Sequence, residues 1–240
     1  MVVTLDPPVQ GADPAPPGVL WRILSPIGAV ILAFALLIVG AGALSATDLS
    51  NDASAAILSF VTSLLLLVFG VELWRRLPEH NRRWAVARKG RPRAALALGV
   101  GVGFGIIIAA GAIIIAGQAL DPVVKRRLAE IDDIGTQPWQ LVLTITALVV
   151  LAPLGEELLF RGLLLRGLAR RMRFWPAAIV SGILFASAHA DSYYLWPRAI
   201  ALIGTGVALA WVYRRRGYWA SVTAHATVNI VASIALVASS

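Results

Sequence analysis

Six polar side chains lie inside stretches of sequence that are otherwise apolar enough to span a membrane. They are Glu156, Glu157 and Arg161 in LAPLGEELLFRGLLLRG, His189 in ILFASAHA, and His225 and Asn229 in SVTAHATVNI. An ionisable group buried in hydrocarbon is costly unless it is paired or hydrated, and such residues usually serve a function. This combination indicates a catalytic site built within the bilayer.

The two adjacent glutamates predict a division of labour. Neighbouring residues of a helix diverge by about 100°, so Glu156 and Glu157 face different directions. Glu157 and Arg161 are four residues apart and share a face, in the favourable order of acid before base. We expect Glu157 to pair with Arg161 and Glu156 to face a cavity. The alternative is that both acids are structural and tie neighbouring helices together.

Pro153 and Gly155 come just before these acids. Proline removes a backbone donor and clashes with the preceding turn. A kink here would expose backbone carbonyls and could widen the bundle for water. An ordinary kink without a role is the alternative.

His225 and Asn229 are four residues apart, so both project to one side of the last predicted helix. With His189 and Glu156 they supply a base, imidazoles and hydrogen-bond donors. These groups can activate water and hold a developing oxyanion. The third histidine, His80, lies in a basic segment and is predicted to be solvated.

Composition places the chain in a membrane. It has 240 residues, of which 58% are hydrophobic and 14% charged, and its mean hydropathy is +0.78. Soluble domains are less apolar and carry about 25% charged residues. The net charge of +8 fits basic loops at helix ends better than nucleic-acid binding. The chain has no cysteine, which excludes disulfides, thiolate metal sites and a cysteine nucleophile.

The predicted fold is all-α, a polytopic membrane helix bundle of about seven transmembrane helices. A span needs about 20 apolar residues. Residues 1–20, which are rich in proline, are predicted to form a disordered tail. Residues 21–240 are predicted to form a single transmembrane domain. The predicted spans cover residues 21–46, 53–74, 95–119, 138–165, 174–190, 197–213 and 218–238.

Basic residues predict the topology. They concentrate in the segments 75–94, 166–173 and 214–216, which follow alternate spans. The positive-inside rule then places these segments and the N-terminus in the cytoplasm and the C-terminus outside. The predicted location is the plasma membrane, with multiple passes. The segment 75–94 is also a weaker candidate for binding anionic lipid headgroups.

The third span carries two GxxxG pairs, formed by Gly99, Gly101, Gly103 and Gly105. Small residues at this spacing let helix backbones approach closely. A phosphate-binding loop is not predicted, because the strand context and the Lys-Ser/Thr pair are absent.

The motifs EExxxR at 156–161, FxxxH at 185–189 and HxxxN at 225–229 together resemble the CPBP family. These are the CAAX prenyl protease and bacteriocin-processing intramembrane proteases, also called the ABI family. The resemblance covers residues 138–238. It implies that Glu156 deprotonates the attacking water, that His189 positions it, and that His225 and Asn229 stabilise the oxyanion. It also implies that Glu157 and Arg161 form a supporting salt bridge and that Phe185 is structural.

The resemblance leaves the metal open. Catalytic zinc is held by three protein ligands with one open position, and Glu156, His189 and His225 are the candidates. The chain has no HExxH to place two histidines on one helical turn. Water activation by Glu156 without a required metal is favoured, and zinc is the alternative.

The predicted function is that of an intramembrane endopeptidase acting on membrane-associated proteins or peptides. The predicted partners are these substrates and the lipid bilayer, and nucleic acid is not among them. Specificity for prenylated proteins is not carried over. Two alternatives stay open: a non-catalytic scaffold or immunity protein on the same fold, and a proton-coupled carrier, because buried Glu and His also relay protons.

Overall fold

The computed structural model describes residues 18–129 and 137–239, and every regular element in these ranges is a helix. The separate helices are α1 (Val19–Leu44), α2 (Asn51–Arg75), α3 (Glu79–Ala85), α4 (Pro92–Leu120), α5 (Pro122–Ala129), α9 (Phe174–Ser187), η3 (Ala190–Tyr193), α10 (Trp196–Arg216) and α11 (Tyr218–Ser239). One further helix runs without interruption through α6 (Pro138–Ile145), η1 (Thr146–Leu151), α7 (Ala152–Glu156), η2 (Glu157–Leu165) and α8 (Arg166–Leu168). We call this segment the central helix.

The all-helical membrane class is confirmed, and each predicted span lies largely on a helix. Four helices are long and apolar enough to cross a membrane: Leu20–Leu44, Asn51–Arg75, Pro92–Leu120 and Pro138–Leu168. The helix Phe174–Ser187 is apolar but shorter. The count of about seven spans therefore stays a prediction. The predicted tail, residues 1–20, lies mostly outside the described residues, and α1 begins at Val19.

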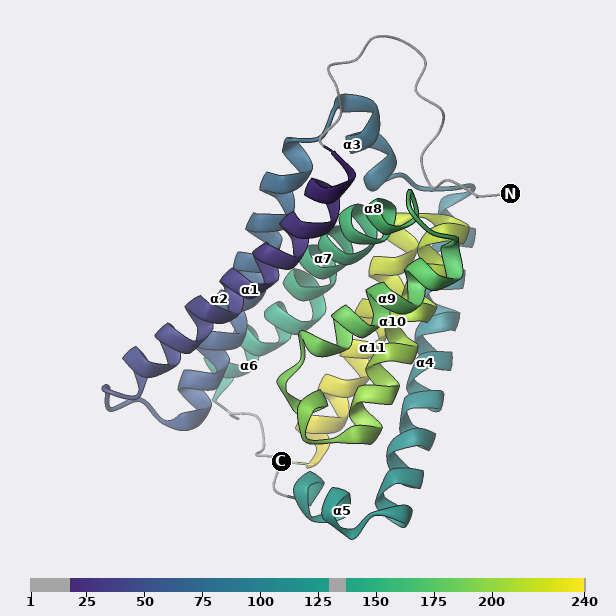
Figure 1. Cartoon of the computed structure of the whole chain (residues 1–240). Helices are drawn as coiled ribbons and strands as arrows, with labels where there is room; N and C mark the ends of the chain where they lie inside the picture. The colour runs from purple at the N-terminus through teal and green to yellow at the C-terminus, as the bar shows by residue number, and fades with distance from the viewer. Residues whose placement is uncertain (1–17, 130–136, 240) are drawn as a thin grey trace.

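The central helix runs between two groups of helices (Figure 1). On one side it packs against α1 and α2, which form an antiparallel pair. On the other side it packs against α11, which also contacts α4 and α10. The short helix α9 packs against α10 and against the η2 part of the central helix. Because it is surrounded in this way, η2 is buried along its whole length.

The segments that carry most of the basic residues gather at one end of the bundle, where Figure 1 shows α3, α8 and the start of α1. A backbone bridge between Arg88 and Gly217 joins the α3–α4 connection to the α10–α11 turn. Gly217 has φ +84°, and a Cβ there would lie 2.0 Å from the carbonyl oxygen of Ala87. The ammonium of Lys89 donates to the carbonyl of Arg214 at 3.2 Å. Burial, with the charge of Arg214, lowers the pKa of Lys89.

Only one of the two GxxxG pairs packs against another helix. A Cβ on Gly99 would lie 2.6 Å from the carbonyl oxygen of Ala220 on α11, and one on Gly103 would lie 2.7 Å from the Cβ of Thr227. A Cβ on Gly101 or Gly105 would meet no atom within 4 Å. The Gly99–Gly103 face of α4 therefore sets how closely α11 approaches, while the other pair faces outward.

This difference predicts the effect of two matched substitutions. Gly103→Ala should force α4 and α11 apart and cost about 1–3 kcal/mol, as overpacking typically does. Gly105→Ala should leave stability unchanged or slightly raised, because alanine is the better helix former. Thermal unfolding of the purified variants in detergent measures both. Equal unfolding midpoints for the two variants would contradict this account of the helix contact.

Candidate active site

The central helix is distorted where Pro153 interrupts its hydrogen bonding. In η1 the N–H of Ala152 bonds to the carbonyl of Ala147, five residues earlier. The same pattern would pair the carbonyl of Leu148 with the N–H of residue 153, but proline has none. The side-chain amide of Asn229 donates to the Leu148 carbonyl instead, with Nδ2 and O 2.6 Å apart. Asn229 thus replaces the backbone donor that Pro153 lacks.

The carboxylate of Glu157 is fully buried and accepts three side-chain hydrogen bonds. Arg161 Nη1 donates to its Oε1 at 2.8 Å, and His225 Nδ1 donates to the same oxygen at 3.1 Å. The hydroxyl of Ser221 donates to Oε2. The expected ion pair between Glu157 and Arg161 is present, and both side chains are 0% exposed. Buried charges need this degree of pairing to be tolerated.

The guanidinium of Arg161 is held by further contacts from two other helices. Its Nη2 donates to the carbonyl of Gly206 on α10 at 3.1 Å. Its Cζ lies 4.6 Å from the ring centroid of Phe185 on α9, which is within the range of a cation–π contact. A Cβ on Gly206 would lie 2.6 Å from the Cα of Gly182, so only a glycine here allows α9 and α10 to approach this closely.

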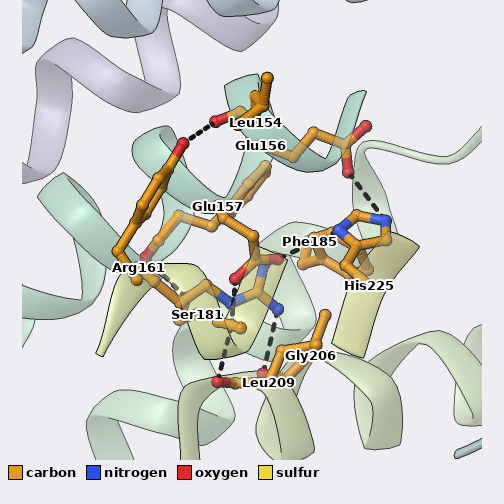
Figure 2. A network of polar contacts seen from close by, with 12 residues as sticks. Leu154, Glu156, Glu157, Arg161, Ser181, Phe185, Gly206, Leu209 and His225 are labelled. Atoms are coloured by element: carbon orange, nitrogen blue, oxygen red, sulfur yellow. Dashed lines mark hydrogen bonds and ion pairs between the residues drawn. The ribbon is translucent and has the colours of Figure 1, made fainter. Parts of the chain in front are cut away.

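Glu156 points away from this ion pair. Figure 2 shows Glu156 reaching toward the ring of His225, while Glu157 lies beside Arg161. The Oε2 of Glu156 is 4.0 Å from the Nε2 of His225. This oxygen is buried and has no hydrogen-bond partner among the described residues. Glu156 is therefore the carboxylate that the protein leaves available, while its neighbour is fully engaged.

His189 lies beyond a helix end rather than within a span. The predicted span 174–190 is too long here, because α9 ends at Ser187. The ring of His189 still folds back over α9, where Nδ1 donates to the carbonyl of Phe185 at 2.9 Å. A carbonyl only accepts, so Nδ1 carries a proton, and in the neutral ring Nε2 offers a lone pair. The turn that follows is fixed by Ser192, whose hydroxyl donates to the carbonyl of His189 at 2.7 Å.

The ring of Phe185 lies among residues of all three motifs. Its centroid is 4.9 Å from the ring of His189 and 5.8 Å from that of His225. Arg161 lies over it, as described above. Phe185 is itself 1% exposed. This side chain therefore lies between two imidazoles and a guanidinium, which it contacts through ring packing and a cation–π interaction.

Two of the predicted site residues share a cavity. Glu156 and His189 line a space of about 370 Å³ between α1, α2 and the central helix. His225 and Asn229 do not line it. His225 approaches Glu156 from the α11 side, and Asn229 binds the backbone of the central helix. The six residues thus form three pairs. Glu156 and His189 line the cavity, and Glu157 and Arg161 form the buried ion pair. His225 and Asn229, on α11, lie between the cavity and the ion pair.

The residues named for the zinc alternative can be compared with the arrangement of the site. Within residues 18–129 and 137–239, no three His, Asp or Glu side chains are grouped closely enough to hold a metal ion. The predicted ligands Glu156, His189 and His225 are therefore not gathered as a ligand set.

Sequence reasoning missed two residues of α11 that contact the central helix. The hydroxyl of Tyr218 donates to the carbonyl of Leu154 at 2.8 Å, and Ser221 binds Glu157. Tyr218, Ser221, His225 and Asn229 follow one another at spacings of three, four and four residues, which places them on one face of a helix. This face is the signal that could have identified them.

These features define an all-helical membrane protein with a carboxylate and two imidazoles at a buried site. Residues 138–231 match the model of the Rce1-like family, described as type II CAAX prenyl endopeptidase Rce1-like. This segment holds all three motifs, so the match agrees with the resemblance seen in the sequence. No curated protein and no solved structure matches the chain.

A double-mutant cycle can test whether the amide of Asn229 takes the place of the N–H that Pro153 lacks. Asn229→Leu should leave the Leu148 carbonyl unpaired and cost roughly 1–3 kcal/mol. In a Pro153→Ala background, residue 153 has an N–H for that carbonyl, so Asn229→Leu should cost clearly less. Thermal unfolding in detergent gives the four stabilities.

Ser233→Ala is the control for this cycle. Its hydroxyl has no hydrogen-bond partner among the described residues, so its effect should add to that of Pro153→Ala. An equal cost of Asn229→Leu in both backgrounds would show that the two residues are not linked in this way.

Proposed function

We propose that this protein is an intramembrane endopeptidase, which hydrolyses peptide bonds of membrane-associated proteins or peptides. The observation that carries the proposal is the state of Glu156: a buried carboxylate oxygen without a partner, beside His225 and in one cavity with His189. The family match supports the same reaction class. Leaving such a group unpaired is unfavourable, so its availability for chemistry explains it best.

In this proposal Glu156 and His189 activate a water molecule. Nε2 of His189 accepts a hydrogen bond from the water and orients it, while Glu156 takes its proton as general base. The resulting hydroxide attacks the carbonyl carbon of the scissile peptide bond. Glu156 then gives the proton to the leaving nitrogen as the C–N bond breaks. One water is consumed, and one carboxyl and one amino group are formed.

The oxyanion of the tetrahedral intermediate is assigned to His225 and Asn229. Since Nδ1 of His225 donates to Glu157, its donor toward the oxyanion must be a second proton, on Nε2. In this proposal His225 is therefore an imidazolium whose charge is paired with the carboxylate of Glu157. Asn229 uses one amide hydrogen on Leu148 and has a second one available. Donors held rigidly before the reaction stabilise a developing charge most effectively. Glu157 and Arg161 support this arrangement by fixing the ring of His225.

The substrate is proposed to enter from the side, between α1 and α9. A second cavity of about 560 Å³ lies there, and its lining is almost wholly apolar. It shares Val30, Phe34, Phe160 and Ala188 with the cavity that holds Glu156. An apolar segment could therefore pass from the bilayer to the carboxylate without crossing a charged region.

The remaining features of the proposal concern the setting of the enzyme. All seven long or apolar helices cross the plasma membrane, including α10 and α11, which have 21 and 22 residues and so reach about 30 Å. The N-terminus is cytoplasmic, since the basic segments gather at the end where α1 starts. The reaction as written needs no metal.

Glu156→Gln should abolish cleavage while the protein still folds. The amide keeps the shape of the side chain but cannot take the proton from water. New N-termini of membrane proteins, compared by mass spectrometry between cells expressing the parent chain and the variant at equal levels, give the readout. Glu72→Gln, at an exposed surface ion pair, is the control and should cleave normally. Identical cleavage products with Glu156→Gln would reject the proposed function.

Filling the lateral cavity should slow cleavage of membrane-embedded substrates. Ala35 lines this cavity, so Ala35→Phe should lower kcat/KM about tenfold or more by obstructing access. Leu32→Phe adds a similar ring one turn earlier, at a residue that is 49% exposed and outside the lining. Its kcat/KM should stay near that of the parent. Equal rates for both variants would exclude entry between α1 and α9.

A further inference from the structure

One wall of the cavity that holds Glu156 and His189 is a row of hydroxyl groups on α2. Ser59, Thr62 and Ser63 all line this cavity. Thr62 and Ser63 lie three and four residues after Ser59, so each shares a face of the helix with Ser59 and the three span about 100° around it. None of them belongs to the three motifs, which lie in the second half of the chain.

These three hydroxyls are not used by the protein itself. Elsewhere in its helices, Ser25, Thr205, Thr223 and Thr227 each donate to the backbone carbonyl four residues earlier. The side-chain hydroxyls of Ser59, Thr62 and Ser63 make no hydrogen bond to any other described residue, although the backbone of all three is bonded within α2. Their donors and acceptors are therefore available to whatever occupies the cavity.

The three unpaired hydroxyls lie at a depth where leaving them unpaired is unfavourable. Ser63 is the middle residue of α2, so the hydroxyls lie near the centre of the bilayer, where unpaired polar groups are costly. The neighbouring lateral cavity differs. Of its two lining hydroxyls, that of Ser187 donates to the carbonyl of Leu184 and that of Tyr193 to the carbonyl of Ser187. Hydroxyls without a hydrogen-bond partner thus line the cavity that holds Glu156, and not the lateral cavity.

A peptide about to be hydrolysed needs such groups. A membrane-embedded helix satisfies its own backbone hydrogen bonds, but the scissile bond must be unwound before water can attack it. Each N–H and C=O released by unwinding is costly within the bilayer unless it finds a partner. A hydroxyl can donate and accept, so a row of three can bind either group.

We propose that Ser59, Thr62 and Ser63 form a binding subsite for the unwound peptide backbone beside the scissile bond. This inference rests on the proposed function and extends it: the subsite binds main-chain N–H and C=O groups, so it contributes affinity without reading the substrate's side chains. The cavity volume of about 370 Å³ lies within the range of known ligand sites, about 300–1,000 Å³.

The test uses the peptide with the strongest Glu156-dependent cleavage in the mass-spectrometry comparison, labelled with a fluorophore. Its Kd is measured on the Glu156→Gln protein in lipid nanodiscs, so that binding is separated from cleavage. Ser59→Ala and Thr62→Val, which keeps the branched shape, should each raise Kd about three- to tenfold, the range for one lost hydrogen bond. Ser54→Ala, on α2 but outside the cavity lining, should leave Kd unchanged.

Backbone esters in the peptide identify the partner of each hydroxyl. Replacing one amide by an ester removes its N–H and weakens its carbonyl as acceptor. At the right position, the ester should weaken binding to the parent, and Thr62→Val should then add little further loss. Kd values that do not change in Ser59→Ala and Thr62→Val would overturn the subsite. It would also be overturned if Thr62→Val raised Kd by the same factor for every ester peptide and for the all-amide peptide. Cleavage by the Glu156→Gln protein would instead reject the proposed function.

Discussion

The buried ion pair between Glu157 and Arg161 is the constraint on which the rest of the bundle depends. Both side chains are fully buried, and a buried charge that loses its partner destabilises a protein by about 3–5 kcal/mol. The partners come from separate helices: Gly206 on α10, Ser221 and His225 on α11, and the ring of Phe185 on α9. The ion pair is therefore satisfied only when α9, α10 and α11 are all docked.

Helix α11 connects this ion pair to the distorted part of the central helix. One face carries Tyr218, Ser221, His225 and Asn229, which bind two backbone carbonyls and the carboxylate of Glu157. From the same face, Nε2 of His225 comes within 4.0 Å of Glu156. The opposite side packs on the Gly99–Gly103 face of α4, where the backbones approach too closely for any side chain on either glycine. Because close packing against α4 fixes the position of α11, the hydrogen-bond donors on the opposite face of α11 are held in place.

The sequence predicted contacts within one helix and missed most contacts between helices. Glu157 with Arg161 and the direction of Glu156 followed from helical spacing alone. Ser221 binds Glu157 across 64 residues, and α2 supplies a cavity wall without any charged motif, so neither could be found from local spacing. His189 was placed inside a helix because SAHA is apolar, yet α9 ends at Ser187. Local composition does not encode where tertiary packing ends a helix.

The interrupted hydrogen bonding at Pro153 and the candidate site are one feature rather than two. Pro153 leaves the Leu148 carbonyl without a donor, and Asn229 fills that vacancy from α11. The same helix presents His225 one turn earlier, with Nε2 4.0 Å from Glu156. The hydrogen bond from Asn229 to Leu148 thus also fixes where the imidazole of His225 meets the carboxylate of Glu156. A central helix with an N–H at residue 153 would satisfy its own carbonyls, and α11 would lose the contact that holds His225 and Glu156 in register.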